Sequence, residues 1–292
     1  MRDHLLKIQR AKEHLDWIGT YLKPWIEGKK HSQWLEPDDL LPGNTRLMTK
    51  LTEEPAEYPL TVKIGEFLHN MRSSLDLLAY ELAVAYTNPL PDDIAESSEF
   101  PIFGDEDRQG NVGTGNAAFH LKTRKGVPVP GSGLHKIRGM DARAQTEIER
   151  LQPYKRGSLF REDPLWKLHE LDRINKHRLL HVVAISGTLA LRMGAGYDPA
   201  RDYPFTTGDI HSNSGIALSD QSTTIGSFPL RPDIRIKKMK VHPYAAVEVV
   251  IDNVPSLTEA PDLFKGPPVV GPLAEIHSHV VRMVIPTLTR YL

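Results

Sequence analysis

Apolar residues recur at steps of three and four positions over long stretches of this chain, the spacing that places them on one face of a helix. The most regular stretch predicts a helix at residues 64–86, about six turns long. Residues 3–27 show the same spacing with charged residues in between, and Gly28 follows them. They predict an amphipathic surface helix that ends at this glycine.

Three further helices are predicted, two of them from capping signals. Asp141 precedes a helical pattern that continues to residue 151 and stops before Pro153, which predicts a helix at 141–151. The pair Asp163-Pro164 has the order of a cap followed by a proline and predicts a helix at 164–180. A closing helix is expected at 273–292, kinked or broken at Pro286.

Other segments carry the β-branched and aromatic residues that favour strands. Residues 45–51 and 58–62 are short and predict a hairpin. Past residue 180, the segments 181–193, 215–228 and 234–251 alternate in part, with Gly, Pro and Asp at the breaks. They predict an antiparallel sheet of about three to five strands.

Helices, then strands, then a helix is the order of an α+β fold. We expect a helical core of about four to five helices, packed with a small antiparallel sheet in the C-terminal half and closed by the C-terminal helix. The chain is interpreted as a single elaborated domain, 1–292, with a helical part at about 1–180 and a β-rich part at about 181–255. Residues 88–133, rich in Pro and Gly, are either a lid over a site or an unstructured insert.

Composition narrows the functional classes. With 40% hydrophobic and 25% charged residues, the chain is of the ordinary globular type. Its 36 basic and 37 acidic residues create no global field for a polyanion, so nucleic-acid binding requires a local basic patch. Cysteine is absent, which excludes disulfides and cysteine nucleophiles. The charged N-terminus is unlike a signal peptide, and the most apolar stretch, 179–193, is too short and polar to span a bilayer, so we expect a cytoplasmic protein without a membrane partner.

The two central helices each carry polar residues on or beside their apolar stripe. On the 64–86 helix, these residues share one flank and are His69, Arg72 and Asp76. On the 164–180 helix, Asp172 and Asn175 lie inside a leucine stripe. His169 and Lys176 lie at the edge of that stripe. We predict that these seven residues form a binding site or a polar network.

A carboxylate or an amide among leucines needs a partner, because an unpaired neutral group costs about 1–3 kcal/mol and a charge costs more. If the two helices pack together, Arg72 or His69 meets Asp172, while Asn175 satisfies a backbone group or a second side chain. Such contacts are found both in buried structural networks and in binding or catalytic sites. The sequence leaves both interpretations open.

The opposite face of the 164–180 helix carries a local basic patch. Arg173 and His177 lie one turn apart there, and Lys176 is close to both. Such a patch suits a phosphate group. Basic residues are also favoured at a solvated helix C-terminus, where they interact with the helix dipole.

The segments GEFLHNMRSSLDLLAYELA, LQPYK and LWKLHELDRINKHRLL resemble a widespread family of uncharacterised bacterial proteins over roughly residues 60–182. The family has no established activity. The resemblance therefore implies a shared fold and no mechanism.

A more distant resemblance is to HEPN domains, helical bundles of bacterial conflict systems, many of which are metal-independent ribonucleases. Their motif is an Arg, four to six further residues and a His. A polar residue usually follows the Arg. Here only three residues separate Arg173 from His177, and the apolar Ile174 follows the Arg, so both the spacing and this position depart from the motif. The resemblance implies that His177 acts as the catalytic acid–base beside an RNA oxygen while Arg173 binds the phosphate.

We expect no metal and no cofactor. His69, His169, Asp172 and His177 are possible ligands on helices, but His169 and His177 lie roughly 80° apart around one helix, too far for one ion. On the closing helix, Glu275 shares a face with a histidine one turn later, and His277 lies between them, but the rest of the zinc-protease pattern is missing.

Two functional hypotheses follow. The first is an uncharacterised binding or structural interaction protein of unknown partner. The second is an RNA-binding protein or ribonuclease that uses Arg173, Lys176 and His177. The second requires Arg173 and His177 to line an open concave surface. Since twofold homodimers are the commonest oligomers, a homodimer is a further option for either.

Overall fold

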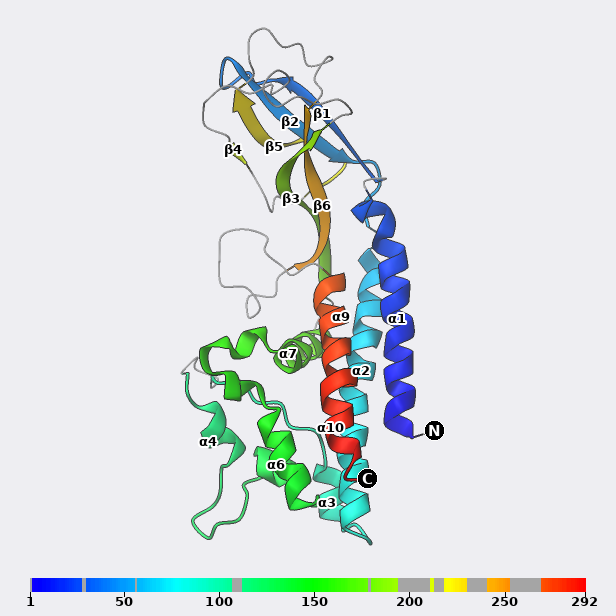
Figure 1. Ribbon diagram of the computed structural model, residues 1–292, viewed down its shortest axis with the longest axis vertical. Coiled ribbons are helices and arrows are strands. Elements are labelled where there is room, and N and C mark those ends of the chain that lie inside the picture. The colour runs from blue at the N-terminus through cyan, green and yellow to red at the C-terminus, as the bar shows by residue number, and fades with distance from the viewer. Residues whose placement is uncertain are drawn as a thin grey trace.

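Three long helices run side by side along most of the molecule, and the strands gather at one end (Figure 1). The computed structural model describes residues 2–27, 30–55, 57–106, 112–177, 180–193, 211–212, 218–229, 241–252 and 269–292. The fold is α+β and has the closing C-terminal helix, as the sequence predicts. No helix in these ranges is long and apolar enough to cross a bilayer.

Two of the long helices, α1 (Asp3–Ile26) and α2 (Glu57–Tyr86), pack against each other. Helix α2 includes residues 58–62, so the predicted strand there, and its hairpin with 45–51, are wrong. Leu60 and Ile64 belong to the same fully buried stripe, and burial of this stripe outweighs the weak strand preference of the local sequence. Pro59 is tolerated because it lies in the first turn, where its nitrogen has no helical acceptor.

The third long helix is built from α9 (Val270–His279), a π-helical segment (Val280–Val284) and α10 (Ile285–Thr289). These three pieces follow one another without a gap, so the helix widens before Pro286 instead of breaking there. The proline lacks an N–H and crowds the preceding turn, and a π-helical turn is a recognised way to accommodate such a defect.

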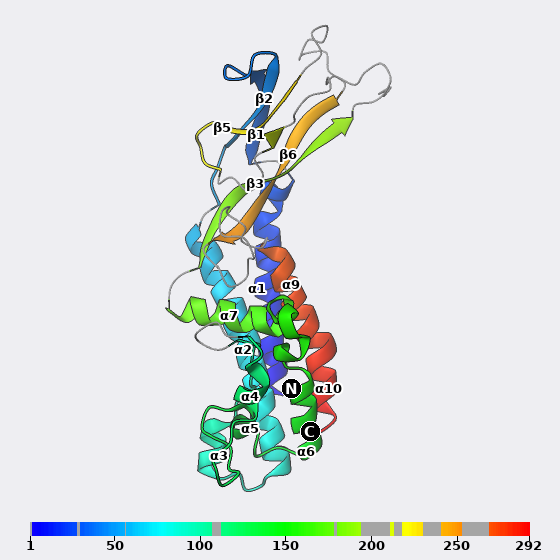
Figure 2. The same ribbon diagram turned by 90° about the vertical axis from the view of Figure 1, so that its left-hand side faces the viewer.

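Both predicted helix caps are confirmed. Asp141 accepts a hydrogen bond of 2.8 Å from the Arg143 N–H and begins α6 (Ala142–Arg150). Asp163 accepts one of 2.9 Å from the Leu165 N–H and begins α7 (Pro164–His177). Figure 2 shows α7 lying across the long helices, where it contacts α2 and α9. Residues 178–179, at the predicted end of this helix, are outside the described ranges.

The described strands form two antiparallel sheets. One has the order β1-β2-β5-β4, with bounds His31–Pro37, Asn44–Leu51, Thr223–Pro229 and His211–Ser212. The other pairs β3 (His181–Met193) with β6 (Val241–Asp252). The antiparallel pairing agrees with the prediction. The pairing of the N-terminal strand β2 with β5 was not predicted. Residues 215–217 and 234–240 of the predicted strands are outside the described ranges.

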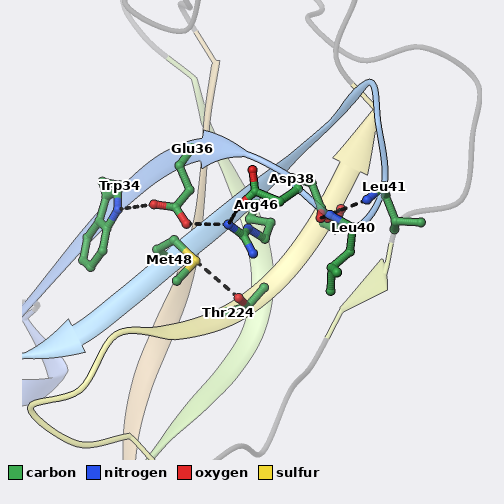
Figure 3. A network of polar contacts seen from close by, with 10 residues as sticks. Trp34, Glu36, Asp38, Leu40, Leu41, Arg46, Met48 and Thr224 are labelled. Carbon is green, nitrogen blue, oxygen red and sulfur yellow. Dashed lines mark hydrogen bonds and ion pairs between the residues drawn. The ribbon is translucent and has the colours of Figure 1, made fainter.

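A polar network fixes the β1–β2 loop and the strand beside it (Figure 3). The buried Asp38 carboxylate accepts hydrogen bonds from the Leu40 and Leu41 N–H groups at 2.9 and 3.1 Å. It also accepts one of 2.5 Å from the Ser227 hydroxyl on β5. These hydrogen bonds lower the pKa of Asp38, the one from Ser227 most strongly. Arg46 adds ion pairs to two neighbouring acidic residues, Glu36 and Asp39.

The described residues of the segment 88–133 form short helices, and some of their side chains belong to the core. They include α3 (Asp92–Ser97) and α4 (Gly115–Phe119), and α5 (Gly133–Lys136) follows directly. Phe100 and Phe119 are fully buried. These two aromatic side chains form part of the packed end of the molecule, so an unstructured insert does not describe the residues around them.

Candidate functional site

An open hollow of about 550 Å³ lies where α7 crosses α2, with α1 alongside. Its volume is in the range of small-molecule sites. Helix α1 contributes Lys7, and α7 contributes Asp172, Asn175 and Lys176. Helix α2 provides the remaining wall with Thr61, Val62, Gly65, Glu66, His69 and Asn70.

Gly65 allows α7 to approach α2 closely. A Cβ atom on residue 65 would lie 2.7 Å from Oδ1 and 2.8 Å from Nδ2 of Asn175. Since such contacts are too short for real carbon atoms, any larger residue would displace the Asn175 amide. Glycine in a helix interior costs about 1 kcal/mol relative to alanine. Its presence here is explained by the close approach of Asn175, which shapes the hollow.

Asp172 supplies a buried carboxylate to the wall of the hollow, with only 4% of the residue exposed. Its Oδ2 forms an ion pair of 2.7 Å with Lys176 Nζ. Its Oδ1 is buried and has no hydrogen-bond partner among the described residues. Neither Arg72 nor His69, the two partners that we expected, bonds to it. The unpaired oxygen is energetically costly unless a donor from outside the chain reaches it.

Several other groups in the hollow are also available to a ligand. Within the described structure, the Lys7 ammonium and the Asn175 amide make no hydrogen bond or ion pair. His69 is exposed and has only a long contact, 3.4 Å, to a neighbouring serine hydroxyl. Glu66, by contrast, accepts a hydrogen bond of 2.7 Å from Lys63, which is the main favourable contact holding its pKa below the ordinary value.

Arg72 and Asp76 form a separate network on another flank of α2, outside the hollow. Arg72 donates to the Phe100 carbonyl at 2.7 Å and to Asp76 at 3.2 Å, and Asp76 accepts from the Phe100 N–H at 3.0 Å. Burial raises the pKa of Asp76, and the Arg72 charge opposes this shift. These bonds tie α2 to the segment that follows α3, so the network links two parts of the core.

His169 is near this second network. Its ring contacts that of Trp166, with centroids 5.7 Å apart. Burial lowers the pKa of His169 to about 4, and the charge of Arg72 contributes to the shift. His169 is therefore neutral at pH 7. The seven residues predicted as one site are thus divided: His69, Asp172, Asn175 and Lys176 line the hollow, whereas Arg72, Asp76 and His169 do not.

Arg173 and His177 are exposed on α7, one turn apart, and neither lines the hollow. The Arg173 guanidinium is held by the buried Glu170 carboxylate through Nε at 2.7 Å and Nη2 at 2.5 Å. Among the described residues His177 has no such partner. Glu170 therefore partly neutralises the basic patch at Arg173, the residue that binds the phosphate according to the HEPN resemblance.

No three His, Asp or Glu side chains come together as metal ligands in the part of the chain that the structure describes. Glu275, from the histidine-rich end of α9, forms an ion pair of 2.8 Å with Lys167 on α7. Burial lowers the pKa of both His277 and His279. The ion pair of Glu275 joins α9 to α7.

Sequence reasoning missed Lys7, Gly65, Glu66 and Asn70. Gly65 carries a recognisable signal, because a glycine inside the most regular helix of the chain indicates a close approach by another element. Lys7 carries none, since it is one of many charged residues on the exposed side of α1. Its position in the hollow depends on how α1 packs against α2. Comparison with family models, curated proteins and solved structures gave no match to this chain.

Proposed function

We propose that this protein is a binding protein and that its ligand is a small polar molecule held in the hollow between α1, α2 and α7. The observation that carries the proposal is the buried Asp172 Oδ1, which has no partner among the described residues although Oδ2 is paired with Lys176. Buried polar atoms are rarely left unpaired, and exceptions are concentrated at functional sites. A bound donor would satisfy this oxygen when the side chain turns it toward the hollow.

The other groups of the hollow support the same function. Lys7 and Asn175 present donors and acceptors that packing within the described chain does not use, and His69 has only its long contact to the serine hydroxyl. The cysteine-free sequence remains our reason for expecting the protein to work in the cytoplasm.

Equilibrium dialysis against a mixture of polar metabolites, with the retained compounds identified by mass spectrometry, tests the proposal. His69→Trp fills the hollow from an exposed position and should abolish retention without unfolding the protein. Tyr80→Trp is the matched control, because Tyr80 lies on the same helix, is 43% exposed and is outside the hollow. Retention that is absent, or equal in His69→Trp and wild type, would contradict the proposal.

A ribonuclease is the second candidate, and the observation that favours it is the exposure of Arg173 and His177 on one face of α7. It predicts cleavage of tRNA or single-stranded RNA that survives EDTA and disappears in the Arg173→Ala/His177→Ala variant. An intact RNA substrate after incubation with the wild type would remove this candidate. The result leaves the hollow unaffected, because neither residue lines it.

A further inference from the structure

We infer that the ligand of the hollow is a small zwitterion, a molecule that carries an ammonium group and a carboxylate or similar anionic group a few bonds apart. This inference rests on the proposed function and specifies its ligand class. It follows from three properties of the lining: the balance of its charges, the unpaired carboxylate oxygen on α7 and the unpaired ammonium on α1.

The charges of the lining cancel. Two lysines, Lys7 and Lys176, face two carboxylates, Glu66 and Asp172. Complementarity of charge determines which ligands a site admits, and a lining with charges of both signs favours a ligand that carries both signs. A nucleotide or a polyamine would bring an uncompensated charge into the hollow. A ligand with one charge of each sign would not.

Asp172 provides the contact for the positive end of the ligand. Glu66 is already bonded to Lys63, and Oδ2 of Asp172 to Lys176. Oδ1 of Asp172 is left without a donor among the described residues. An ammonium group is a strong donor for a carboxylate oxygen, since the hydrogen bond is charge-assisted at both ends. The Asn175 amide beside it can accept a second ammonium hydrogen through its oxygen.

Lys7 provides the contact for the negative end. Its ammonium forms no ion pair with any described residue, and it is half-buried where α1 borders the hollow. Lys176 is already shared with Asp172, so Lys7 is the lysine of the lining that has no ion pair among the described residues. The two ends of the ligand are thus assigned to different helices, which places the molecule across the junction of α1 and α7.

A series of ω-amino acids from glycine to 6-aminohexanoate tests this assignment by calorimetry or by NMR titration. Each is compared with the diamine and the dicarboxylate of the same carbon number. We expect one amino acid to bind at least about tenfold more tightly than both matched compounds, because it alone forms both charge-assisted contacts. Equal or tighter binding of a diamine or a dicarboxylate would overturn the zwitterion assignment, as would no binding by any probe.

Two variants test separately the contact with the ammonium group and the contact with the carboxylate of the ligand. Asp172→Asn should weaken the amino acid and the diamine about tenfold and spare the dicarboxylate. Lys7→Met should weaken the amino acid and the dicarboxylate and spare the diamine, with Lys12→Met, outside the hollow on the same helix, as its control. A merely structural role would weaken all ligands alike and would overturn the assignment. If these probes fail while dialysis still shows retention blocked by His69→Trp, the ligand class is wrong and the proposed function stands.

Discussion

Asp163 and Asp172 are both buried carboxylates of the same helical segment, but only one is satisfied by the chain itself. Asp163 caps α7 through the Leu165 N–H at 2.9 Å. Asp172 has one oxygen paired with Lys176 and one that is unpaired among the described residues. The first carboxylate therefore contributes to stability, whereas the second lowers stability in the absence of a ligand.

This contrast predicts opposite responses to removal of the two charges. Asp172→Leu should raise the free energy of unfolding by about 1 kcal/mol, because an incompletely paired buried charge is replaced by an apolar group and Lys176 can return to water. Asp163→Ala should lower it by about 1 kcal/mol through loss of the cap. Urea denaturation of both variants measures the difference. A loss of stability in Asp172→Leu would mean that the carboxylate is structural.

His169 gives a pH dependence of known sign. Its pKa is about 4 in the folded protein, against 6.5 for an ordinary histidine. Between these values the unfolded chain binds a proton that the folded protein does not, so stability falls as pH drops from about 6.5 to about 4. The effect of this one group is at most about 3 kcal/mol. His169→Gln should flatten the curve of unfolding free energy against pH in that window, and an unchanged slope would contradict the assignment.

At the scale of elements, the crossing of α2 and α7 depends on one glycine and one asparagine. Gly65→Ala places a methyl group in the space of the Asn175 amide, so the gain of about 1 kcal/mol in helix propensity is offset by displacement of that side chain. In an Asn175→Ala background the same change should stabilise by the full amount. A double-mutant cycle by urea denaturation measures this coupling, and additive effects would show that the two residues do not meet.

Helices were predictable from the sequence because their signals are local. The caps at Asp141 and Asp163 and the apolar stripe of α2 gave correct elements, with ends shifted by several residues. The strand predicted at 58–62 failed because burial of Leu60 and Ile64 determines that segment. The pairing of β2 with β5 had no signal at all, since it joins strands some 180 residues apart and is set by tertiary packing.

The candidate site was half predictable for the same reason. Asp172 and Asn175 are conspicuous because polar residues inside a leucine stripe conflict with the helical pattern. The partners of Asp172 and Asn175 could not be predicted. A sequence shows which residues need a contact, but it does not show which helix supplies that contact. Lys176 was assigned to the edge of the stripe and proved to be the partner of Asp172. Arg72, the partner expected, bonds to Asp76 and to a backbone carbonyl.

The strands of the molecule gather at one end, and the helices run along the rest (Figure 1). The hydrogen bond between Asp38 and Ser227 connects residues 189 positions apart and holds the β1–β2 loop against β5. The hollow lies away from this end, at the crossing of α7 and α2. We therefore expect that a substitution that loosens the strands at this end leaves the hollow unchanged.

Asp38→Ala tests this separation. Loss of the carboxylate releases the Leu40 and Leu41 N–H groups and the Ser227 hydroxyl, so amide hydrogen exchange should accelerate in β1, β2 and β5. Exchange in α1, α2 and α7 should stay as in the wild type. Mass spectrometry of peptic fragments resolves the two regions. Faster exchange throughout would show that strands and helices open as one unit.

The central claim is that the hollow between α1, α2 and α7 is where this protein binds its ligand. The most direct test is to map amide chemical shifts by two-dimensional NMR while the protein is titrated with the compound that dialysis retains. We expect the amide signals of Gly65, Asn70 and Asn175 to shift most in the wild type. In the His69→Trp variant we expect no shifts. Shifts centred on Arg173 and His177, or spread evenly over the molecule, would contradict it.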